Sequence, residues 1–360
     1  MKNKIMFVIP ALRDGGAERV ITRLASGLTK KGYEIHILEF FKPVSGYVLE
    51  DAVHRHSMFA HEEEYRKTTF LQRNKLIRKM IKQIDPDAIV PFLEYVCQKV
   101  QLAVFGTKYF RRVTVTIRNS PTVGNWVYKL RRLTSIALSN SCITQSQRQK
   151  EFFPRWLRGK IDVVANPVDY IEEAFCESTQ KVKFVAAGRL VPQKNYPLLI
   201  EAFARVAAQR EADLDIFGAG ELKESLREMV ANKGLCDRIF IRDYSHDLLG
   251  EYRKSSIYVL SSDWEGMPNA MMEAMALGMP CIATDCPTGP AELIADGKTG
   301  LLVPMNDADA LASAMIKLID EPNLRKQMGL SAREYIIRTY GLESITQQWV
   351  EILKSRRVIE

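Results

Sequence analysis

Short apolar runs alternate with amphipathic helical patterns from one end of the sequence to the other, and this alternation narrows the choice of fold. The runs are rich in Val, Ile and Phe and are continuous rather than interrupted at every second position. Such runs are typical of parallel strands in a sheet that helices cover on both faces. The pattern predicts strands at residues 4–10, 34–41, 87–92, 113–117, 141–144, 161–164, 182–187, 213–217, 237–241, 256–260, 280–284 and 299–302.

Two sets of about six strands in a chain of 360 residues predict two doubly wound α/β domains with parallel sheets. We expect the first domain over residues 1–170 and the second over residues 171–340. The join is expected near Asn166–Tyr170 and the polar stretch at 177–181. Residues 341–360 include apolar side chains at helical spacing, so we expect a final helix there that packs back on the first domain.

Ligands of open parallel sheets bind beyond the carboxyl ends of the strands. In a chain with two such domains, the natural binding site is a cleft where these ends face each other. Candidate site residues are therefore those that follow predicted strands: Gly15, Gly16, Asn119, Gly188, Arg189, Gly218 and Glu265.

Composition argues against several other classes of protein. No apolar run reaches the roughly 18–20 residues that a membrane-spanning helix needs. The N-terminal apolar run leads into glycines and fits a buried first strand better than a signal peptide. The six cysteines form no C-x-x-C pair and have no histidine at metal-ligand spacing, so we expect reduced thiols, a cytoplasmic protein and no metal site.

Two cations, Arg189 and Lys194, lie five residues apart in the loop after the strand at 182–187. A planar guanidinium fork and a flexible ammonium can together bind a diphosphate. Cations are also common in exposed loops, so this spacing alone leaves a purely solvated role open.

Two glutamates, Glu265 and Glu273, are separated by seven residues around a predicted helix start at Pro268. Glu265 is expected in the loop just before the helix. Glu273 lies among methionines and alanines, where a carboxylate needs hydrogen-bond donors. Vicinal ribose hydroxyls are suitable donors. A salt bridge from Glu273 to a neighbouring arginine is the alternative.

Together these motifs resemble those of retaining GT-B glycosyltransferases of family 4, which assemble bacterial capsules, lipopolysaccharides and N-glycans. The resemblance covers nearly the whole chain, and the Glu265–Glu273 segment with its upstream Arg/Lys loop is its most specific part. Supporting segments are Gly-Gly-Ala-Glu-Arg at 15–19, Asn-Pro-Val-Asp at 166–169, Gly-Arg-Leu at 188–190 with Lys-Asn at 194–195, Gly-Ala-Gly-Glu at 218–221, Gly-Pro-Ala-Glu at 289–292 and Gly-Lys-Thr-Gly-Leu-Leu at 297–302.

The resemblance implies a GT-B fold, with two Rossmann-like domains facing across a cleft, and a transfer reaction. A hexose or N-acetylhexosamine would move from a nucleotide sugar, by family-level expectation a UDP sugar, with retention of its anomeric configuration. The acceptor would be a glycan or a polyprenyl-diphosphate-linked glycan in bacterial surface polysaccharide synthesis. The nucleotide sugar is a substrate, and neither a cofactor nor a metal is implied.

The resemblance also implies roles for individual residues. Arg189 and Lys194 would bind the donor diphosphate and stabilise its developing charge. Glu265 would contact the sugar hydroxyls and Glu273 the ribose. The residues implied in catalysis are Glu265, Arg189, Lys194 and Asn119. Those implied in donor binding are Gly15, Gly16, Arg118, Gly188, Gly218, Tyr244, Met267, Pro268, Asn269, Ala270 and Glu273.

Asn119 is a departure from the family pattern. Many relatives have a histidine near the reacting carbon at this place, whereas this chain has Arg118-Asn119. An amide can donate a hydrogen bond to a sugar or phosphate but cannot act as a general base. The departure favours catalysis assisted by the diphosphate over a histidine-based mechanism.

Positive charge is concentrated in the first domain. Residues 1–170 contain 29 Lys and Arg against 15 Asp and Glu, and the rest of the chain contains 22 against 28. Residues 66–82 combine seven cations with apolar residues, as in a basic amphipathic helix on an anionic membrane. We therefore expect peripheral association with the inner face of the plasma membrane. The alternative is that Leu76, Ile77, Met80 and Ile81 face the protein core.

Three competing functions are weaker. A sugar-nucleotide epimerase or dehydrogenase would need a dinucleotide glycine fingerprint after the first strand, and Gly15-Gly16 does not supply one. A nucleic-acid-binding protein would need an interleaved aromatic and basic surface, so no nucleic-acid partner is expected. A catalytically inactive nucleotide-sugar-binding module is disfavoured because Arg189, Lys194, Glu265 and Glu273 are all present.

Overall fold

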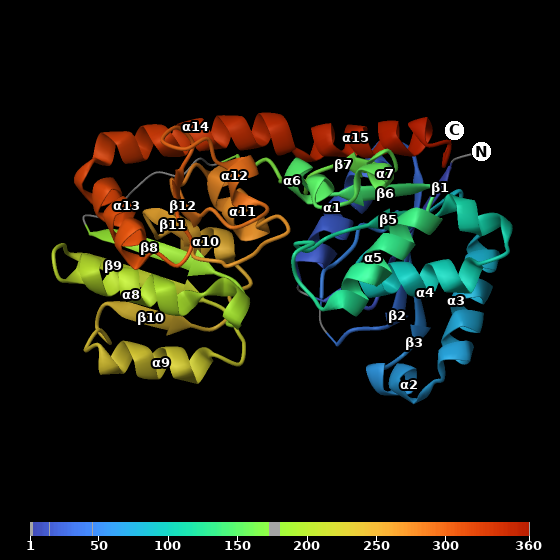
Figure 1. Ribbon diagram of the computed structural model, residues 1–360, viewed down its shortest axis with the longest axis horizontal. Coiled ribbons are helices and arrows are strands. Elements are labelled where there is room, and N and C mark those ends of the chain that lie inside the picture. The colour runs from blue at the N-terminus through green and yellow to red at the C-terminus, as the bar shows by residue number, and fades with distance from the viewer. Residues whose placement is uncertain (1–2, 14, 45, 173–180, 360) are drawn as a thin grey trace. The chain divides into compact units, whose positions relative to one another are not determined.

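A computed structural model describes residues 3–13, 15–44, 46–172 and 181–359 of the chain, which divides into two compact units (Figure 1). Unit 1 comprises Met1–Pro167 together with Leu342–Glu360, and unit 2 comprises Val168–Gly341. The division falls at the predicted join near Asn166–Tyr170. Cys176 and residues 177–180 of the predicted polar stretch lie outside the described residues.

Unit 2 contains a six-stranded parallel sheet in the order β10–β9–β8–β11–β12–β13. Counted from the start of the unit this is 3-2-1-4-5-6, the order of the doubly wound dinucleotide-binding fold. The strand order reverses between β8 and β11, so these two neighbours define the topological switch point of the sheet. The strands are β8 (Val182–Ala187), β9 (Ala212–Phe217), β10 (Ile239–Arg242), β11 (Ile257–Leu260), β12 (Cys281–Thr284) and β13 (Leu301–Val303).

Helices connect the strands of unit 2 because each parallel strand needs a crossover to return to the same edge of the sheet. Their apolar faces pack against the sheet in a core that includes Phe184, Phe203 and Met315. The helices are α8 (Tyr196–Ala207), α9 (Lys223–Asn232), α10 (Leu248–Arg253), α11 (Asn269–Leu277), α12 (Pro290–Leu293), α13 (Ala308–Asp320) and α14 (Pro322–Tyr340), with the 3-10 turn η2 (Pro192–Lys194) before α8.

Unit 1 has a four-stranded sheet, β3–β2–β1–β4, and a three-stranded sheet, β5–β6–β7. An isolated parallel bridge between Ile89 and Val113 joins the two sheets. All the pairs are parallel, as predicted. The strands are β1 (Lys4–Ile9), β2 (Glu34–Phe41), β3 (Val53–Phe59), β4 (Ala88–Pro91), β5 (Thr114–Thr116), β6 (Ser141–Thr144) and β7 (Ile161–Val163).

The sequence pattern missed β3. Val53 is buried, but most of the strand is exposed or half-buried. Strand β3 is an edge strand of its sheet and has β2 as its neighbour. It therefore lacks the continuous apolar run of a central strand.

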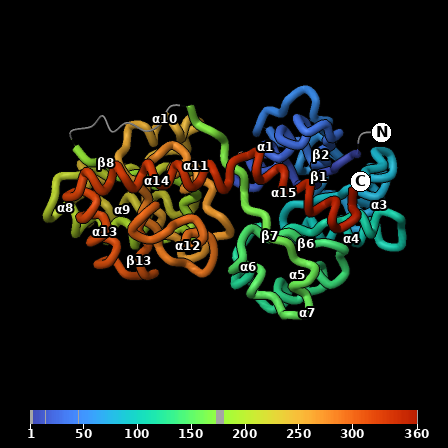
Figure 2. Tube along the Cα trace, turned by 90° about the horizontal axis from the view of Figure 1, so that it is seen from above, coloured from blue at the N-terminus to red at the C-terminus, as the bar shows by residue number. Residues whose placement is uncertain are grey.

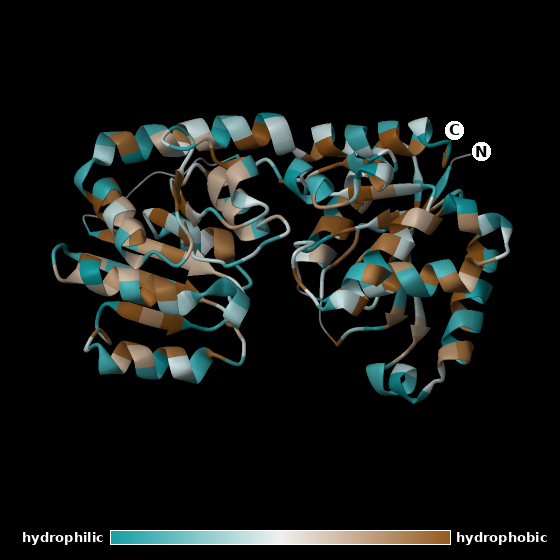
Figure 3. Cartoon of the chain, in the orientation of Figure 1, coloured by the Kyte–Doolittle hydropathy of each residue, from teal (hydrophilic) through white to brown (hydrophobic). Residues whose placement is uncertain are grey.

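The helices of unit 1 cover its sheets in the same way, and apolar residues gather on the central strands (Figure 3). They are α1 (Gly16–Lys30), α2 (Glu62–Lys67), α3 (Phe70–Ile84), α4 (Glu94–Val104), η1 (Lys108–Arg112), α5 (Trp126–Leu138), α6 (Gln147–Glu151), α7 (Arg155–Arg158) and α15 (Leu342–Ser355).

Helix α15 brings the end of the chain back into unit 1. It runs beside α1 (Figure 2), where an added Cβ at Gly27 would lie 2.3 Å from Thr346 Oγ1. The ring of Trp349 is fully buried and lies 6.5 Å from the ring of Phe7 and 6.4 Å from that of Phe92. The final helix therefore supplies part of the core of unit 1.

The predicted basic helix at 66–82 needs correction. The structure divides this segment between α2 and α3, because Thr69 begins α3 with a capping box to Gln72. Ile77 and Ile81 are buried, and Met80 packs against the same core. Most of the apolar face is thus used inside unit 1, although Phe70 and Leu71 at the start of α3 are exposed. Among the described residues, no helix is both long and apolar enough to cross a membrane.

Candidate functional site

The predicted cations and Glu265 lie at the switch point of unit 2. Arg189 and Lys194 follow the carboxyl end of β8, and Glu265 follows the carboxyl end of β11, the strand next to β8. The crevice beyond such a strand pair is the usual ligand site of a doubly wound sheet. Sheet topology therefore brings together two loops that are about 70 residues apart in sequence.

Lys194 and Glu265 form a buried ion pair. Lys194 Nζ lies 2.6 Å from Glu265 Oε1, and the two side chains are only 15% and 7% exposed. Ser262 Oγ donates to the same oxygen at 2.7 Å. Charge-assisted hydrogen bonds of this kind are the stronger ones in proteins, so the Glu265 carboxylate is held in a defined position.

Backbone contacts hold the loop that carries Glu265. Thr288 Oγ1 donates to the carbonyl of Glu265 itself. Gln193 Nε2 donates to the carbonyl of Trp264 at 2.8 Å, and the Asp263 N–H donates to the carbonyl of Gln193 at 2.9 Å. Gln193 therefore ties the two loops at the switch point to each other beside the Lys194–Glu265 pair, and Thr288 holds Glu265 from a third loop, after β12.

Arg189 differs from Lys194 in being exposed. Its guanidinium donates to Gln193 Oε1 at 3.3 Å, a long hydrogen bond between two loop side chains. An exposed arginine whose fork can still turn is able to bind an incoming anion, whereas Lys194 already neutralises a carboxylate.

Gly188 and Gly218 allow two loops to approach closely. An added Cβ at Gly218 would lie 1.9 Å from the carbonyl oxygen of Gly188. An added Cβ at Gly188 would lie 3.0 Å from Lys194 Cε and 3.0 Å from the hydroxyl of Tyr196. The geometry thus gives both glycines a packing role at the switch point, and their predicted contact with the donor stays a prediction.

Glu273 lies inside α11, on a helix that is otherwise apolar. It is 3% exposed, between Met272 and Ala274, which are also buried. Glu273 has an interaction partner within the protein. Met267 and Pro268 before the helix are buried, and Asn269 and Ala270 in its first turn are half-buried.

Tyr244 is placed apart from the Lys194–Glu265 pair. It follows β10, the edge strand of the sheet, and β9 separates that strand from β8. Tyr244 is 38% exposed, and the centre of its ring lies 5.1 Å from that of His246. It shares the carboxyl edge of the sheet with Arg189, but the structure does not bring the two side chains together in a described contact.

The predicted residues of unit 1 also follow strands. Gly15 caps α1 and Gly16 begins it, at the end of the segment that follows β1. Asn119 is exposed, and its Oδ1 accepts from the backbone N–H of Ser120 at 2.8 Å. The Asn119 amide is oriented by the backbone N–H of the next residue and keeps its NH₂ group as a donor.

Arg118 packs into unit 1 as an aromatic-stacked cation. Its guanidinium carbon lies 4.3 Å from the ring centre of Phe92 and 5.5 Å from that of Trp349. Nη1 donates to Asn166 Oδ1 at 3.2 Å, whereas Nε and Nη2 are buried and have no hydrogen-bond partner among the described residues. Burial, the largest cause, lowers the pKa of this guanidinium below its ordinary value.

Sequence reasoning missed Ser262, Gln193 and Thr288. All three lie within or next to the segments that the motifs single out, but hydroxyl and amide side chains are common in loops. Their contacts with the Glu265 loop identify these three residues, and those contacts can be seen only once the fold is known.

Comparison with known proteins agrees along nearly the whole chain. The sequence model described as Glycosyltransferase Family 4 matches residues 14–171, and that of Glycosyl transferases group 1 matches residues 171–335. A similar protein is an α-1,4-N-acetylgalactosaminyltransferase of Campylobacter jejuni, which is 25% identical over 97% of this chain and 98% of its own. The name of that enzyme includes a PP-undecaprenol-linked glycan.

Solved structures show the same fold. The Staphylococcus aureus protein TarM, in a complex with UDP, has a TM-score of 0.82 at 16% identity and covers 98% of this chain and 99% of its own. The Anabaena protein HepE, in a complex with UDP-glucose, has a TM-score of 0.80 at 18% identity, with coverage of 98% and 99%.

Proposed function

The chain belongs to the group 1, family 4 glycosyltransferases with the GT-B fold, and on this premise we propose that it transfers a hexose or N-acetylhexosamine from a UDP sugar with retention of configuration. The acceptor in this proposal is a glycan or a polyprenyl-diphosphate-linked glycan of a bacterial surface polysaccharide. The chain is a glycosyltransferase, and the donor, the acceptor and the stereochemistry are what the proposal adds.

The observation that carries the proposal is the Lys194–Glu265 pair at the switch point of unit 2, with Arg189 exposed beside it. A diphosphate needs cations, and a sugar needs an oriented carboxylate that accepts hydroxyl protons. Both kinds of group lie at the carboxyl ends of the adjacent strands β8 and β11. This combination suits a nucleotide sugar better than a simple phosphate or a simple sugar.

The proposed chemistry uses these groups in the departure of the leaving group. The bond between the sugar C1 and the diphosphate oxygen breaks, and Arg189 and Lys194 stabilise the negative charge that develops on the diphosphate. The acceptor hydroxyl attacks C1 from the same face, and its proton passes to a diphosphate oxygen. Glu265 holds the sugar hydroxyls, so that the face of C1 from which the diphosphate leaves stays turned toward the acceptor hydroxyl.

Other donor contacts are proposed by family resemblance. Glu273 would hold the ribose, Tyr244 would contact the base, and Gly16 would leave room for the phosphates. Asn119 would donate its amide N–H to the sugar or phosphate, since an amide cannot take the acceptor proton. No metal is expected in this reaction, so transfer should persist in EDTA.

The acceptor proposal rests on charge and on the name of a relative. Residues 1–170 carry an excess of 14 cations, 29 minus 15, and a lipid diphosphate is an anion. The Campylobacter relative is named for a PP-undecaprenol-linked glycan. Exposed Phe70 and Leu71 beside the cations of α3 favour contact with an anionic membrane, although most of the apolar face of that helix is buried. Vesicle co-sedimentation of wild-type protein with F70S/L71S protein tests this contact, and equal binding of the two would contradict it.

The first test is donor binding. Thermal shift against a panel of nucleoside diphosphates and nucleotide sugars should give the largest rise in Tm with one UDP sugar, because a ligand that binds the folded state stabilises it. A preference for NAD over every nucleotide sugar would instead support an epimerase or dehydrogenase.

The second test is transfer by the Glu265→Gln variant, which keeps the shape of the side chain but loses its charge. Transfer of radiolabelled sugar to membrane extracts should fall strongly while UDP still raises Tm. Transfer at the wild-type rate would rule out the proposed role of Glu265. UDP-sugar binding without any transfer by wild-type protein would support an inactive binding module.

A further inference from the structure

Three of the five histidines of the chain lie on the neighbouring strands β2 and β3 of unit 1. His36 on β2 is directly opposite His54 on β3, and His56 follows two residues later on the same strand. Side chains two residues apart in a strand point to the same face of the sheet, so Glu34 and His36 share a face of β2. The sheet therefore gathers four potential ligand side chains (Glu34, His36, His54 and His56).

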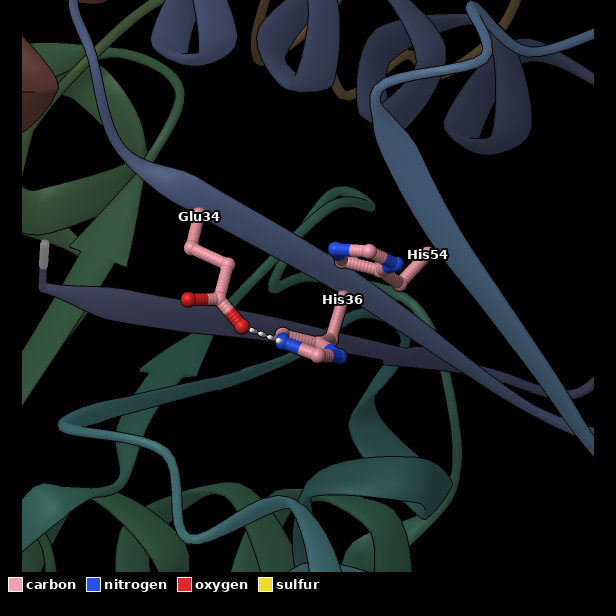
Figure 4. Close-up of side chains that lie close together, drawn as sticks. All are labelled: Glu34, His36 and His54. Atoms are coloured by element: carbon pink, nitrogen blue, oxygen red, sulfur yellow. Dashed lines mark hydrogen bonds and ion pairs between the residues drawn. The ribbon is translucent and has the colours of Figure 1, made fainter.

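Three of these side chains are close enough to share one ion. Potential ligand atoms of Glu34, His36 and His54 all lie within 4.8 Å of one another. Glu34 Oε1 is 2.9 Å from His36 Nε2, as Figure 4 shows with a dashed line. The rings of His36 and His54 are stacked, with centres 4.8 Å apart and planes inclined by 26°.

We propose that Glu34, His36 and His54 bind one divalent transition-metal ion, with Zn²⁺ as the species that best fits the donor set. Zinc takes imidazole nitrogens and carboxylate oxygens at about 2.0–2.2 Å in a tetrahedron, with ligand atoms about 3.3 Å apart. The Glu34–His36 contact already has nearly that separation. Two imidazoles and one carboxylate leave the fourth position for water.

His56 is not one of the three proposed ligands, but it is placed to orient His36. His36 Nδ1 lies 2.9 Å from His56 Nε2, and the planes of the two rings are nearly parallel, inclined by 17°. A histidine that binds a metal through one nitrogen usually gives the proton on its other nitrogen to a fixed partner, which orients the ring. His56 is placed to accept that proton when His36 Nε2 binds the ion.

Binding requires two small movements. The ring of His54 must turn out of its stack on His36, and it is free to do so because His54 is exposed. The Lys4 side chain is 37% exposed, and its ammonium, 3.6 Å from Glu34 Oε1, must move away from the carboxylate. Lys4 therefore opposes the metal by charge, which makes its replacement a specific test.

The position of the site separates it from the proposed sugar transfer. Glu34 and His36 lie at the amino end of β2, whereas Gly15 and Gly16 follow the carboxyl end of β1 in the same sheet. An ion at this place would join the edge strand β3 to β2 rather than contact the donor phosphates. Its expected effect is on the stability of unit 1 and not on transfer. The family resemblance implies no metal for the transfer reaction, and cysteine and histidine spacing predicts none elsewhere. Spacing along the sequence cannot show side chains that meet across strands.

Isothermal titration calorimetry with ZnCl₂ tests the proposal on full-length C176S/C236S protein freed of metal with EDTA. Those two substitutions remove the exposed thiol of Cys236 and the thiol of Cys176 as competing ligands. We expect one saturable site and a Zn²⁺-dependent rise in Tm. H54Q and E34Q should lose saturable binding, and H56Q should weaken it by about 10–100-fold. K4M should tighten it.

The matched control is H61Q, which removes an exposed histidine outside the cluster. H61Q should bind Zn²⁺ like the parent protein. Absence of saturable binding by the parent, or equal binding by H54Q and E34Q, would overturn the proposal. Circular dichroism shows whether each variant is folded. Because E34Q and H54Q alter different strands, a folding defect in one leaves the other as the test.

Discussion

Lys194 Nζ lies 2.6 Å from Glu265 Oε1, so the cation that is predicted to bind the donor diphosphate also neutralises the carboxylate that is predicted to bind the sugar. The pair is buried at the end of two adjacent strands. When a diphosphate binds, the ammonium can contact both anions, since it has three donors. The pair thus couples the two parts of the proposed donor site.

Removing one member of the Lys194–Glu265 pair should lower the stability of the protein strongly. Lys194→Met leaves a buried carboxylate without its cation, and loss of one partner of a buried pair typically costs about 3–5 kcal/mol. In the Lys194→Met/Glu265→Gln double variant no unpaired charge remains, so the double variant should be destabilised by less than the sum of the two single changes. Urea unfolding of all four proteins measures this coupling. Additive effects would show that the two side chains do not interact in solution.

Ser262 should matter for transfer more than for donor binding. Its hydroxyl donates to Glu265 Oε1 at 2.7 Å and orients the carboxylate. A hydrogen bond to a charged group contributes about 1.5–3 kcal/mol, so Ser262→Ala should lower kcat by about 10-fold or more. The Kd for UDP should change little, because the hydroxyl does not belong to the diphosphate loop.

Ser262→Thr is the matched variant, because it keeps the hydroxyl. Recovery of kcat in this variant would show that the hydrogen bond is what matters. A Ser262→Ala enzyme with the wild-type kcat would contradict a role in positioning Glu265.

Much of the fold could be predicted from the sequence because parallel strands that are buried on both faces consist of continuous apolar runs. All twelve predicted strands overlap observed strands. Strand β3 was missed because its side chains are mostly exposed at a sheet edge. The same limit hid the histidine cluster, since two of its members lie on β3.

The segment at 66–82 shows a different limit. An amphipathic pattern states that one face of a helix is apolar, but not whether lipid or protein covers it. Here Ile77 and Ile81 pack on the core of unit 1. The break at Thr69 was readable in principle, because Thr69 and Gln72 have the spacing of a capping box.

For the candidate site, the motifs located the loops but not the contacts between them. Lys194 and Glu265 are 71 positions apart, and this spacing does not predict a contact between them. Their pairing follows from the strand order, which puts β11 next to β8. Tyr244 shows the opposite outcome. It also follows a predicted strand, but that strand lies at the edge of the sheet and not at the switch point.

Trp349 should be essential for the stability of unit 1. Its buried ring packs against Phe7 and Phe92 from the last helix of the chain. Replacing a buried tryptophan with alanine removes these contacts and leaves a cavity, at a cost of about 3–5 kcal/mol. Trp349→Ala should therefore lower Tm markedly in differential scanning calorimetry. Trp126→Ala, at a site that is 74% exposed, is the control and should change stability by no more than about 0.5 kcal/mol.

We expect Arg118 to lower the stability of unit 1 while it contributes to donor binding. Two of its buried guanidinium nitrogens have no hydrogen-bond partner among the described residues, and each such group costs about 1–3 kcal/mol. Arg118→Met removes both groups and keeps a long apolar side chain against Phe92 and Trp349. The loss of the cation–π contacts costs less, about 0.5–2 kcal/mol. Arg118→Met should therefore raise Tm while lowering kcat/KM for the donor.

The opposite signs of the two effects distinguish a binding role from a structural one. A residue retained only for packing would lose stability and activity together, whereas one retained for an anion should lose activity while the fold gains. Arg118→Lys keeps the charge but not the fork, so it should bind UDP more weakly than wild type without the gain in Tm. A lower Tm for Arg118→Met would show that the stacked guanidinium stabilises unit 1, and its assignment to donor binding would then lose this support.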